Sequence, residues 1–184
     1  MMTVEETPLK GCFIITSQVF EDSRGYFYES FNKKKFEKNT GLAVNFVQDN
    51  DSMSSKGVLR GLHFQKGDFQ QAKLVRVIKG SVLDVCVDIR KKSSTFGQYF
   101  SIVLSEINKK QLFVPRGFAH GFVVLEDRTI FNYKCDNYYS KASEDGIIYN
   151  DKTLNIDWQL PNSELILSEK DKVLKTFQNF CNEN

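Results

Sequence analysis

The stretch KLVRVIKGSVLDVCVDIR, residues 73–90, decides the fold class of this chain. Every second residue from Leu83 to Ile89 is aliphatic, and the residues between them include Asp84 and Asp88. A period of two is that of a β-strand, in which successive side chains point to opposite faces of a sheet. The pattern therefore predicts a strand with one face in a core. Its other face is polar and lies either outside the sheet or along a cavity.

Short runs of the same kind recur along the chain and predict an all-β protein. The sequence contains 16 Phe and 7 Tyr together with many Val and Ile, residue types that favour strands. Turn residues separate the runs, and such a series of short strands suits a sandwich or jelly roll. The expected strands are residues 12–16, 25–31, 57–65, 72–80, 82–90, 98–104, 111–115, 121–125 and 129–135.

Two short helices are expected at the periphery of these strands. The first, residues 32–41, begins at Asn32, a residue type that caps helix N-termini. It ends at Gly41, which suits the left-handed conformation that commonly terminates a helix. The second, residues 168–180, places apolar side chains such as Phe177 on one face.

Length and composition limit the classes of protein to which the chain can belong. Its 184 residues, 41% hydrophobic and 26% charged, predict a single domain over residues 1–184. The net charge of +2 is too small to indicate a nucleic-acid partner or an anionic membrane surface. No stretch approaches the roughly 18 apolar residues of a membrane span, and the first residues are acidic and polar. Four scattered cysteines without a CxxC pair favour free thiols, and we expect a cytoplasmic protein.

The two histidines are the most conspicuous candidates for chemistry. His63 and His120 both lie in aromatic-rich, strand-like stretches, where a histidine is commonly structural. A catalytic metal site needs about three protein ligands, and this pair is widely separated with no HxH motif, so we expect no metal. The chain also lacks a GxSxG elbow, a phosphate-binding loop and a GxGxxG motif. What remains is a set of His, Tyr, Lys and Asp residues near strands, which can move protons without a cofactor.

Seven motifs follow one another along nearly the whole chain: FEDSRGYFYESF (20–31), FVQDN (46–50), GVLRGLHFQ (57–65), KLVRVIKGSVLDVCVDIRKKSSTFGQ (73–98), PRGFAHGF (115–122), YKCDNYYS (133–140) and LSEKD (167–171). Together they resemble the motifs of the dTDP-4-dehydrorhamnose 3,5-epimerase family. Because several ordered motifs take part, the resemblance is more specific than any single short pattern. It implies a cupin-like jelly roll with a few short peripheral helices. It also implies a homodimer that works without metal or cofactor in dTDP-L-rhamnose biosynthesis for bacterial polysaccharides.

The resemblance implies a substrate and a reaction as well. The substrate would be dTDP-4-dehydro-6-deoxy-D-glucose, in which the C4 ketone acidifies the hydrogens at C3 and C5. The product would be dTDP-4-dehydro-L-rhamnose. Inversion at each carbon needs a base on one face of the sugar and an acid on the other.

Four residues match catalytic positions of the family. His63 matches the base, and an imidazole titrates near neutral pH. Asp171 matches the carboxylate partner of this base, although the spacing from Ser168 to Asp171 also fits a capping box. Tyr133 matches the acid that protonates the opposite face of the enolate, and it is otherwise a core tyrosine. Lys73 matches a cation near the C4 oxygen, and it is otherwise a surface lysine.

Substrate-binding positions of the family are matched by Arg24, Glu29, Gln48, Asp49, Asn50, Arg60, Lys73, His120, Tyr139, Glu144 and Lys170. Arg24, Arg60 and Lys170 would lie near the diphosphate, where guanidinium and ammonium groups pair with phosphate oxygens. Tyr139 would stack on thymine, and His120 would lie close to the sugar. For each charged residue of this set, a surface salt bridge is the alternative.

Arg60 and His63 raise a question of geometry. They are three residues apart, so a regular strand would point their side chains to opposite faces. A β-bulge at Gly61 would turn both toward one ligand. Alternatively, Arg60 reaches a ligand that is held by the partner subunit.

Two other functions fit part of the pattern. A single-centre epimerase or ketoisomerase for another nucleotide-linked keto sugar would share the site, but the presence of both His63 and Tyr133 favours true inversion. A non-catalytic nucleotide-sugar binding module would need no acid-base pair.

Exposed sheet edges and apolar surface predict association with a second copy of the chain. We expect a two-fold symmetric dimer in which the N-terminal segment, including CFIIT at 12–16, adds to the sheet of the partner. The same segment would bring Arg24 to the neighbouring pocket.

Overall fold

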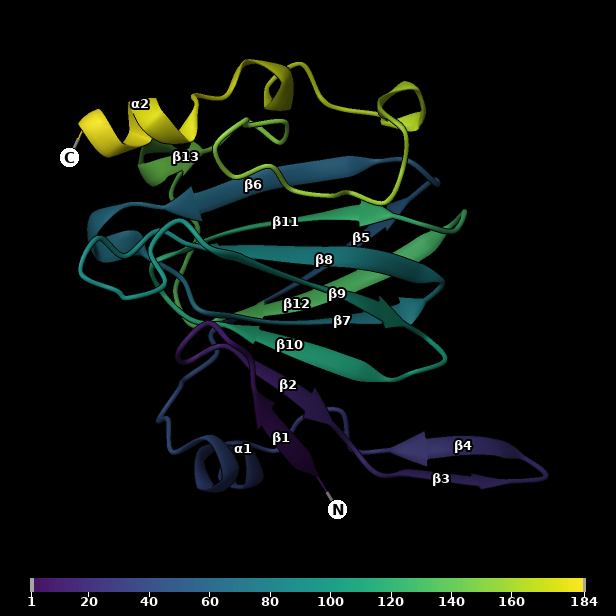
Figure 1. Ribbon diagram of the computed structural model, residues 1–184. Helices are drawn as coiled ribbons and strands as arrows, with labels where there is room; N and C mark the ends of the chain where they lie inside the picture. Colours follow the sequence, from purple (N-terminus) through teal and green to yellow (C-terminus); the bar gives the residue numbers. More distant parts are fainter. Residues whose placement is uncertain (1, 184) are drawn as a thin grey trace.

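The computed structural model describes residues 2–183, and β-strands dominate it (Figure 1). The strands are β1 (Thr3–Glu6), β2 (Phe13–Thr16), β3 (Val19–Asp22), β4 (Gly25–Tyr28), β5 (Gln48–Ser54), β6 (Leu59–Gln65), β7 (Lys73–Lys79), β8 (Ser81–Asp88), β9 (Tyr99–Ser105), β10 (Lys110–Val114), β11 (Phe118–Val124), β12 (Thr129–Cys135) and β13 (Glu144–Gly146). The helices are α1 (Lys33–Thr40) and α2 (Phe177–Asn182), with 3₁₀ turns η1 (Gly67–Phe69), η2 (Lys141–Ser143), η3 (Asn162–Glu164) and η4 (Asp171–Val173). The prediction of an all-β fold with a few short peripheral helices is confirmed.

Two antiparallel sheets form the body of the molecule. The larger has the strand order β1-β2-β10-β7-β12-β5, and the smaller has the order β13-β6-β11-β8-β9. Strands β3 and β4 pair only with each other, and this hairpin projects away from both sheets (Figure 1). The C-terminal segment, drawn in yellow, runs back over the outer side of β6 (Figure 1).

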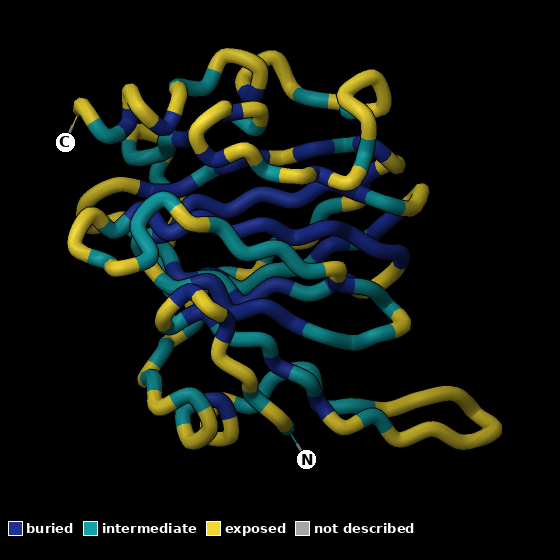
Figure 2. Tube along the Cα trace, in the orientation of Figure 1, coloured by how far each residue is buried: buried dark blue, intermediate teal, exposed yellow. Residues whose placement is uncertain are grey.

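Strand β8 shows how the sheets are held together, because all of its residues are buried. Leu83 and Val85 face a core that the C-terminal segment covers with Trp158 and other apolar side chains. Val82 and Cys86 face a second core, which lies between the two sheets. Figure 2 shows the middle of the smaller sheet as its most buried part. The polar face predicted from the alternation therefore lies inside the protein and not on an outer surface.

Each of the nine expected strands is present, with ends that differ by a few residues. The sequence analysis missed β1, β3, β5 and β13. Strand β5 reads QDNDSMS and has no apolar alternation, because its inward side chains include Gln48 and Asn50. These two polar side chains line a cavity.

Helix α1 forms as its caps predict. The Asn32 side chain accepts a hydrogen bond from the Lys35 N–H at 3.1 Å. Gly41 adopts φ 72°, and its N–H donates to the Glu37 carbonyl. The capping oxygen and the left-handed glycine satisfy backbone groups that a helix end leaves free. No helix within residues 2–183 is long and apolar enough to cross a membrane.

The helix expected over residues 168–180 is wrong in its first half. Only the turn η4 and the short helix α2 form there. Between them Leu174 and Thr176 are extended, and Lys175 makes a parallel β-bridge to Ile147. Pairing with a distant segment thus replaces local helical hydrogen bonds, which an amphipathic pattern alone does not reveal.

The expected role of CFIIT in a partner's sheet is also wrong. Strand β2 pairs with β1 on one edge and with β10 of its own chain on the other. Both rows of its backbone groups are therefore occupied, and Ile15 is fully buried. The edge strands of this sheet are β1 and β5.

The cysteines agree with the expectation of free thiols. All four are unpaired in the structure. The sulfur atoms of Cys12 and Cys86 lie 3.7 Å apart, much farther than the length of about 2.05 Å of a disulfide bond.

Phe36 attaches α1 to the larger sheet, and its replacement tests this packing. The ring is completely buried, with its centroid 5.2 Å from that of Phe113 and 6.0 Å from that of Phe46. Phe36→Ala should lower the free energy of unfolding by about 3–5 kcal/mol in urea titrations, because it leaves a cavity. Ile107→Ala, at a side chain that is 84% exposed, should change it by less than about 0.5 kcal/mol. Equal stability of the two variants would contradict the packing.

Candidate functional site

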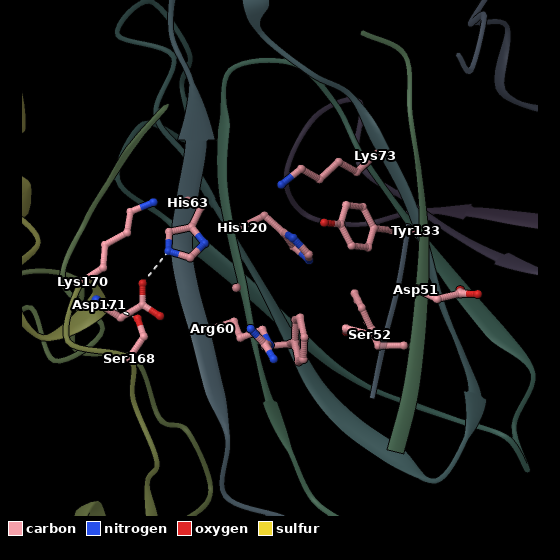
Figure 3. A pocket seen from close by; sticks show the side chains of 13 residues that line it. Asp51, Ser52, Arg60, His63, Lys73, His120, Tyr133, Ser168, Lys170 and Asp171 are labelled. Atoms are coloured by element: carbon pink, nitrogen blue, oxygen red, sulfur yellow. Dashed lines mark hydrogen bonds and ion pairs between the residues drawn. The ribbon is translucent and has the colours of Figure 1, made fainter. Parts of the chain in front are cut away.

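A cavity of about 360 Å³ lies between the two sheets, with the C-terminal segment along one side (Figure 3). Its lining residues are Asp51, Ser52, Arg60, His63, Lys73, His120, Gly121, Phe122, Phe131, Tyr133, Ser168, Lys170 and Asp171. A second cavity of about 270 Å³ adjoins it, because His63, Lys73 and Tyr133 line both. We call the first the inner cavity and the second the adjoining cavity.

A β-bulge in β6 brings Arg60 and His63 to the same cavity, as the sequence analysis proposed. His63 is opposite His120 on β11, whereas Arg60 is opposite Phe122, so β6 contains one extra residue between these pairs. Gly61 occupies the bulge at φ 121°. A Cβ atom there would lie only 2.6 Å from the Cα atom of Gly121, so the close approach of the strands needs a glycine at this position.

His63 is paired with a buried carboxylate from the C-terminal segment. Its Nε2 atom lies 2.5 Å from Oδ1 of Asp171 (Figure 3). The Asp171 side chain is 5% exposed, and that of His63 is 28% exposed. With Nε2 facing the carboxylate, Nδ1 is the ring nitrogen that remains for the cavity.

The surroundings of Asp171 keep it ionised. Burial alone disfavours its charge, but the hydrogen bond from His63 and smaller contributions from Ser168 and Lys170 outweigh it and lower the pKa of this carboxyl. The Ser168 hydroxyl accepts the Asp171 backbone N–H at 3.1 Å. Both interpretations of the LSEKD motif therefore hold in part, since Ser168 caps the turn while the carboxylate itself contacts His63.

Tyr133 and Lys73 face His63 from the other sheet (Figure 3). Tyr133 is on β12 and Lys73 on the neighbouring β7, with the Lys73 Nζ atom 5.8 Å from the centre of the tyrosine ring. Burial raises the pKa of Tyr133, so its phenol stays protonated at neutral pH. Burial lowers the pKa of Lys73, and the nearby carboxylates of Asp84 and Glu144 oppose this effect.

His120 belongs to a second histidine–aspartate pair at the inner end of the cavity. Its Nε2 atom lies 2.9 Å and 3.0 Å from the two carboxylate oxygens of Asp84, and both residues are buried. The His120 ring also stacks at 6.4 Å on Phe131, which lies 4.1 Å from Phe122. The mixture of aromatic and titratable groups expected on β11 and β12 is thus a cavity wall.

Several other predicted binding residues line the adjoining cavity. Gln48 and Asn50 do so from β5, and Tyr139 and Glu144 from the segment after β12. The Tyr139 hydroxyl donates to the Glu144 carboxylate at 2.8 Å, and Lys170 contacts the same carboxylate at 2.5 Å. Tyr139 and Glu144 line the adjoining cavity, and Lys170 lines the inner cavity. The contacts of Glu144 therefore connect the walls of the two cavities.

Three predicted binding residues do not reach these cavities within one chain. Asp49 lies between Gln48 and Asn50 on a regular strand, so its side chain points to the other face, where it pairs with Lys134 at 2.7 Å. Within one chain its side chain therefore does not reach a ligand in these cavities, and its role as a substrate contact stays a prediction. Arg24 lies in the projecting hairpin, where its side chain is 88% exposed and pairs with Asp22. Glu29 follows the same hairpin and bonds Lys35 and Asn32.

Two residues that form or contact the histidine–aspartate pairs, Asp84 and Ser168, were not assigned a functional role from the sequence. Asp84 was recognised only as part of the polar face of β8, and Ser168 only as a helix cap. The signal for Asp84 was present, because an aspartate inside an aliphatic alternation needs a partner if that face is buried. Its partner is on another strand, and the sequence does not state which strand is the neighbour.

The chemical capacity of the site follows from this arrangement. His63 on one sheet, paired with a carboxylate of the C-terminal segment, and a protonated tyrosine on the facing sheet lie on opposite sides of one cavity. Such a pair can remove a proton from one face of a bound molecule and deliver a proton to the other. Within residues 2–183 no group of three or more His, Cys, Asp or Glu side chains is arranged to hold a metal ion.

Comparisons with known proteins all find similarity to one family of enzymes. The profile of the family described as dTDP-4-dehydrorhamnose 3,5-epimerase matches residues 6–179. A dTDP-4-dehydrorhamnose 3,5-epimerase of Escherichia coli is 53% identical over 175 residues, which are 95% of this chain and 94% of that protein. The crystal structure of such an enzyme from Elizabethkingia anophelis superposes with a TM-score of 0.93 at 57% identity, over 97% of each chain. A dTDP-6-deoxy-D-glucose-3,5-epimerase of Legionella pneumophila, in complex with dTDP-4-keto-L-rhamnose, superposes with a TM-score of 0.95 at 46% identity, over 100% of this chain and 96% of that chain.

Proposed function

This chain belongs to the dTDP-4-dehydrorhamnose 3,5-epimerase family, and we propose that its His63 and Tyr133 carry out the proton transfers of that reaction. The enzyme is an isomerase that inverts C3 and C5 of dTDP-4-dehydro-6-deoxy-D-glucose to give dTDP-4-dehydro-L-rhamnose. The observation that carries the residue assignment is the location of the two groups on facing sheets of one cavity.

His63 acts as the base in this proposal. Because the Asp171 carboxylate accepts from Nε2, the neutral ring presents its Nδ1 lone pair to the C3 or C5 hydrogen. The C–H bond breaks, its electron pair moves into the enolate, and the proton stays on Nδ1. The carboxylate of Asp171 orients the ring and stabilises the imidazolium that forms.

Lys73 stabilises the enolate that results. Its ammonium group is on the tyrosine side of the inner cavity, where it donates to the developing charge on the C4 oxygen. A fixed donor in a cavity with little water stabilises such a charge more than it does in bulk solvent. His120, held by Asp84, contacts the sugar from the inner end of the same cavity.

Tyr133 acts as the acid on the opposite face. Its phenol gives a proton to the enolate carbon, and burial, which raises the pKa of Tyr133, keeps that proton available at neutral pH. Each inversion leaves His63 protonated and Tyr133 ionised, so the imidazolium releases its proton to solvent and the phenolate takes one up before the second carbon reacts.

The nucleotide occupies the adjoining cavity in this proposal. Tyr139 offers an exposed ring for stacking on thymine, and Gln48 and Asn50 offer amide groups beside it. Arg60 on β6 and Lys170 on the C-terminal segment, which both line the inner cavity, supply positive charge for the diphosphate.

We also propose a homodimer in which the hairpin β3-β4 of one chain completes the site of the other. The hairpin exposes Phe20, Tyr26 and Phe27 at 56%, 55% and 70%, a group of large apolar side chains that a partner would cover. Arg24 is at the turn of this hairpin and away from the cavities of its own chain, so a role at the diphosphate requires a second chain. Location of the enzyme in the cytoplasm stays a prediction.

His63→Ala should abolish exchange of both the C3 and the C5 hydrogens with solvent, because one base serves both carbons. The measurement is incubation with the dTDP-4-keto sugar in deuterated water, followed by mass spectrometry and NMR of both positions. We expect a loss of at least about 10²-fold with dTDP binding retained. Exchange that continues at either carbon would mean that a second base exists.

Tyr133→Phe should reduce net inversion more than it reduces exchange. The base can return a solvent-derived proton to the face from which it came, whereas inversion needs the phenol on the other side. Inversion should fall by about 10²-fold in the same deuterium experiment. Tyr138→Phe, at an exposed neighbouring tyrosine outside both cavities, is the matched control. An equal loss of exchange and inversion would remove Tyr133 from the role of opposite-face acid.

Complementation between subunits tests the dimer. Arg24→Ala and His63→Ala should each be impaired when pure. Co-expressed, they should regain activity, because a mixed dimer contains one site with both native residues, which is about a quarter of all sites. If light scattering shows dimers and the mixture has no more activity than the average of the two variants, Arg24 does not act on the partner's site. A fully active monomer would rule out the dimer itself.

A further inference from the structure

Asp171 is held by a segment with little regular structure of its own. Residues 164–175, which we call the strap, contain the last residue of η3 and the turn η4 and are otherwise extended or irregular. The strap crosses the outer side of β6 (Figure 1). The Asp171 carboxylate must nevertheless remain within hydrogen-bond distance of the His63 ring on β6. Contacts outside the turn η4 therefore have to hold the strap in place.

The strap is attached at its first end to the residues that precede β6. The Ile166 N–H donates to the Gly57 carbonyl at 2.8 Å, and the Leu59 N–H donates to the Ile166 carbonyl at 2.9 Å. Val58 and Ile166 form a parallel β-bridge between these bonds. The side chains of Leu165 and Leu167 pack on the core that covers the outer face of the smaller sheet.

A second attachment holds the other end of the strap. The Ile148 N–H donates to the Lys175 carbonyl at 2.8 Å, beside the bridge between Ile147 and Lys175. The Lys175 ammonium group also pairs with Asp145 at 2.9 Å. Asp171 thus lies between two attachments, and a shift at either one changes where its carboxylate lies.

Gly57 is the tightest point of the first attachment. A Cβ atom at this residue would lie 2.2 Å from the carbonyl oxygen of Glu164 and 3.4 Å from its carbon. Gly57 also has φ 85°, in the left-handed region that suits glycine. On its other side the Gly57 N–H donates to the Val124 carbonyl at 2.9 Å, so β11 holds Gly57 while the strap rests against it. A side chain at position 57 therefore displaces the strap.

We propose that Gly57 is a positioning residue for catalysis, which sets the location of Asp171 relative to His63 through the close approach of its backbone to Glu164. The inference rests on the proposed role of Asp171 as the partner of the base. Gly57 lines neither cavity, so any effect on the reaction is indirect, and in this proposal it runs through the strap.

A double-mutant cycle with Asp171 tests the inference. Gly57→Ala should lower kcat by about 10- to 10²-fold, because a displacement of the order of 1 Å at a reacting group has effects of this size. Its dissociation constant for dTDP should change by less than about threefold, since Lys170 is the one residue proposed for the nucleotide that belongs to the strap, and Glu144 of β13 pairs with its ammonium group at 2.5 Å. In an Asp171→Asn background, Gly57→Ala should lower kcat by less than about twofold. The reason is that the contact between the Asp171 carboxylate and His63, through which Gly57 acts, is already lost.

The matched control is Gly11→Ala. Gly11 also has φ 85°, but a Cβ atom there meets nothing nearer than 3.9 Å, so this variant carries the same backbone cost without the collision. It should retain kcat within about twofold. If circular dichroism shows that Gly57→Ala does not fold, Ile166→Pro replaces it in the cycle, because it removes the donor to the Gly57 carbonyl and leaves Gly57 unchanged.

The possible results separate this inference from the proposed function. The positioning role would be overturned if Gly57→Ala kept the wild-type kcat, or if it lowered kcat equally in the wild-type and the Asp171→Asn enzymes. Either result would leave His63 as the base and Asp171 as its partner. A full kcat for Asp171→Asn would instead overturn the proposed function of Asp171 itself.

Discussion

The hydrogen bond between His63 and Asp171 is the constraint on which the site depends. It joins the bulged strand β6 to a segment 108 residues later in the chain, and its carboxylate is almost fully buried. A buried carboxylate is costly unless it is hydrogen bonded, and here the ring of His63 is the partner, with smaller favourable contributions from Ser168 and Lys170. This need explains why the C-terminal segment follows the strand closely and gives up the helix that its sequence pattern favours.

The interior between the sheets is polar where chemistry requires it and apolar elsewhere. Asp84 interrupts the aliphatic alternation of β8, and its two oxygens are taken up by His120. Among the side chains of residues 2–183, only the Ser17 hydroxyl is buried without a hydrogen-bond partner. His63 and His120 are therefore held by Asp171 and Asp84 before any ligand arrives. Such preorganisation is what makes electrostatic stabilisation of an enolate effective.

Placing the base and the acid on different sheets has a consequence for the rest of the fold. Their separation depends on how far apart the sheets pack, which the fully buried side chains of the core between them determine, among them Val75, Val82 and Leu112. Interiors of this density deform little, so the two groups keep their positions on opposite sides of the ligand. The hairpin β3-β4, in contrast, makes few contacts with this core, and its exposed rings suit a surface that a second chain covers.

Local patterns in the sequence determined the fold class, the strands with aliphatic alternation, and the caps of α1 at Asn32 and Gly41, and they offered the bulge at Gly61 as one of two alternatives. Each of these follows from the conformations open to a few neighbouring residues, and the ordered motifs added the family and its catalytic residues by resemblance. Only the tertiary structure decided that Asp49 points away from the cavity, that His120 pairs with Asp84, and that β2 stays in its own sheet. It also decided that the strap, and not a helix, carries Asp171. These features depend on contacts between residues far apart in the chain, and a local pattern contains no information about which distant segment will be the neighbour.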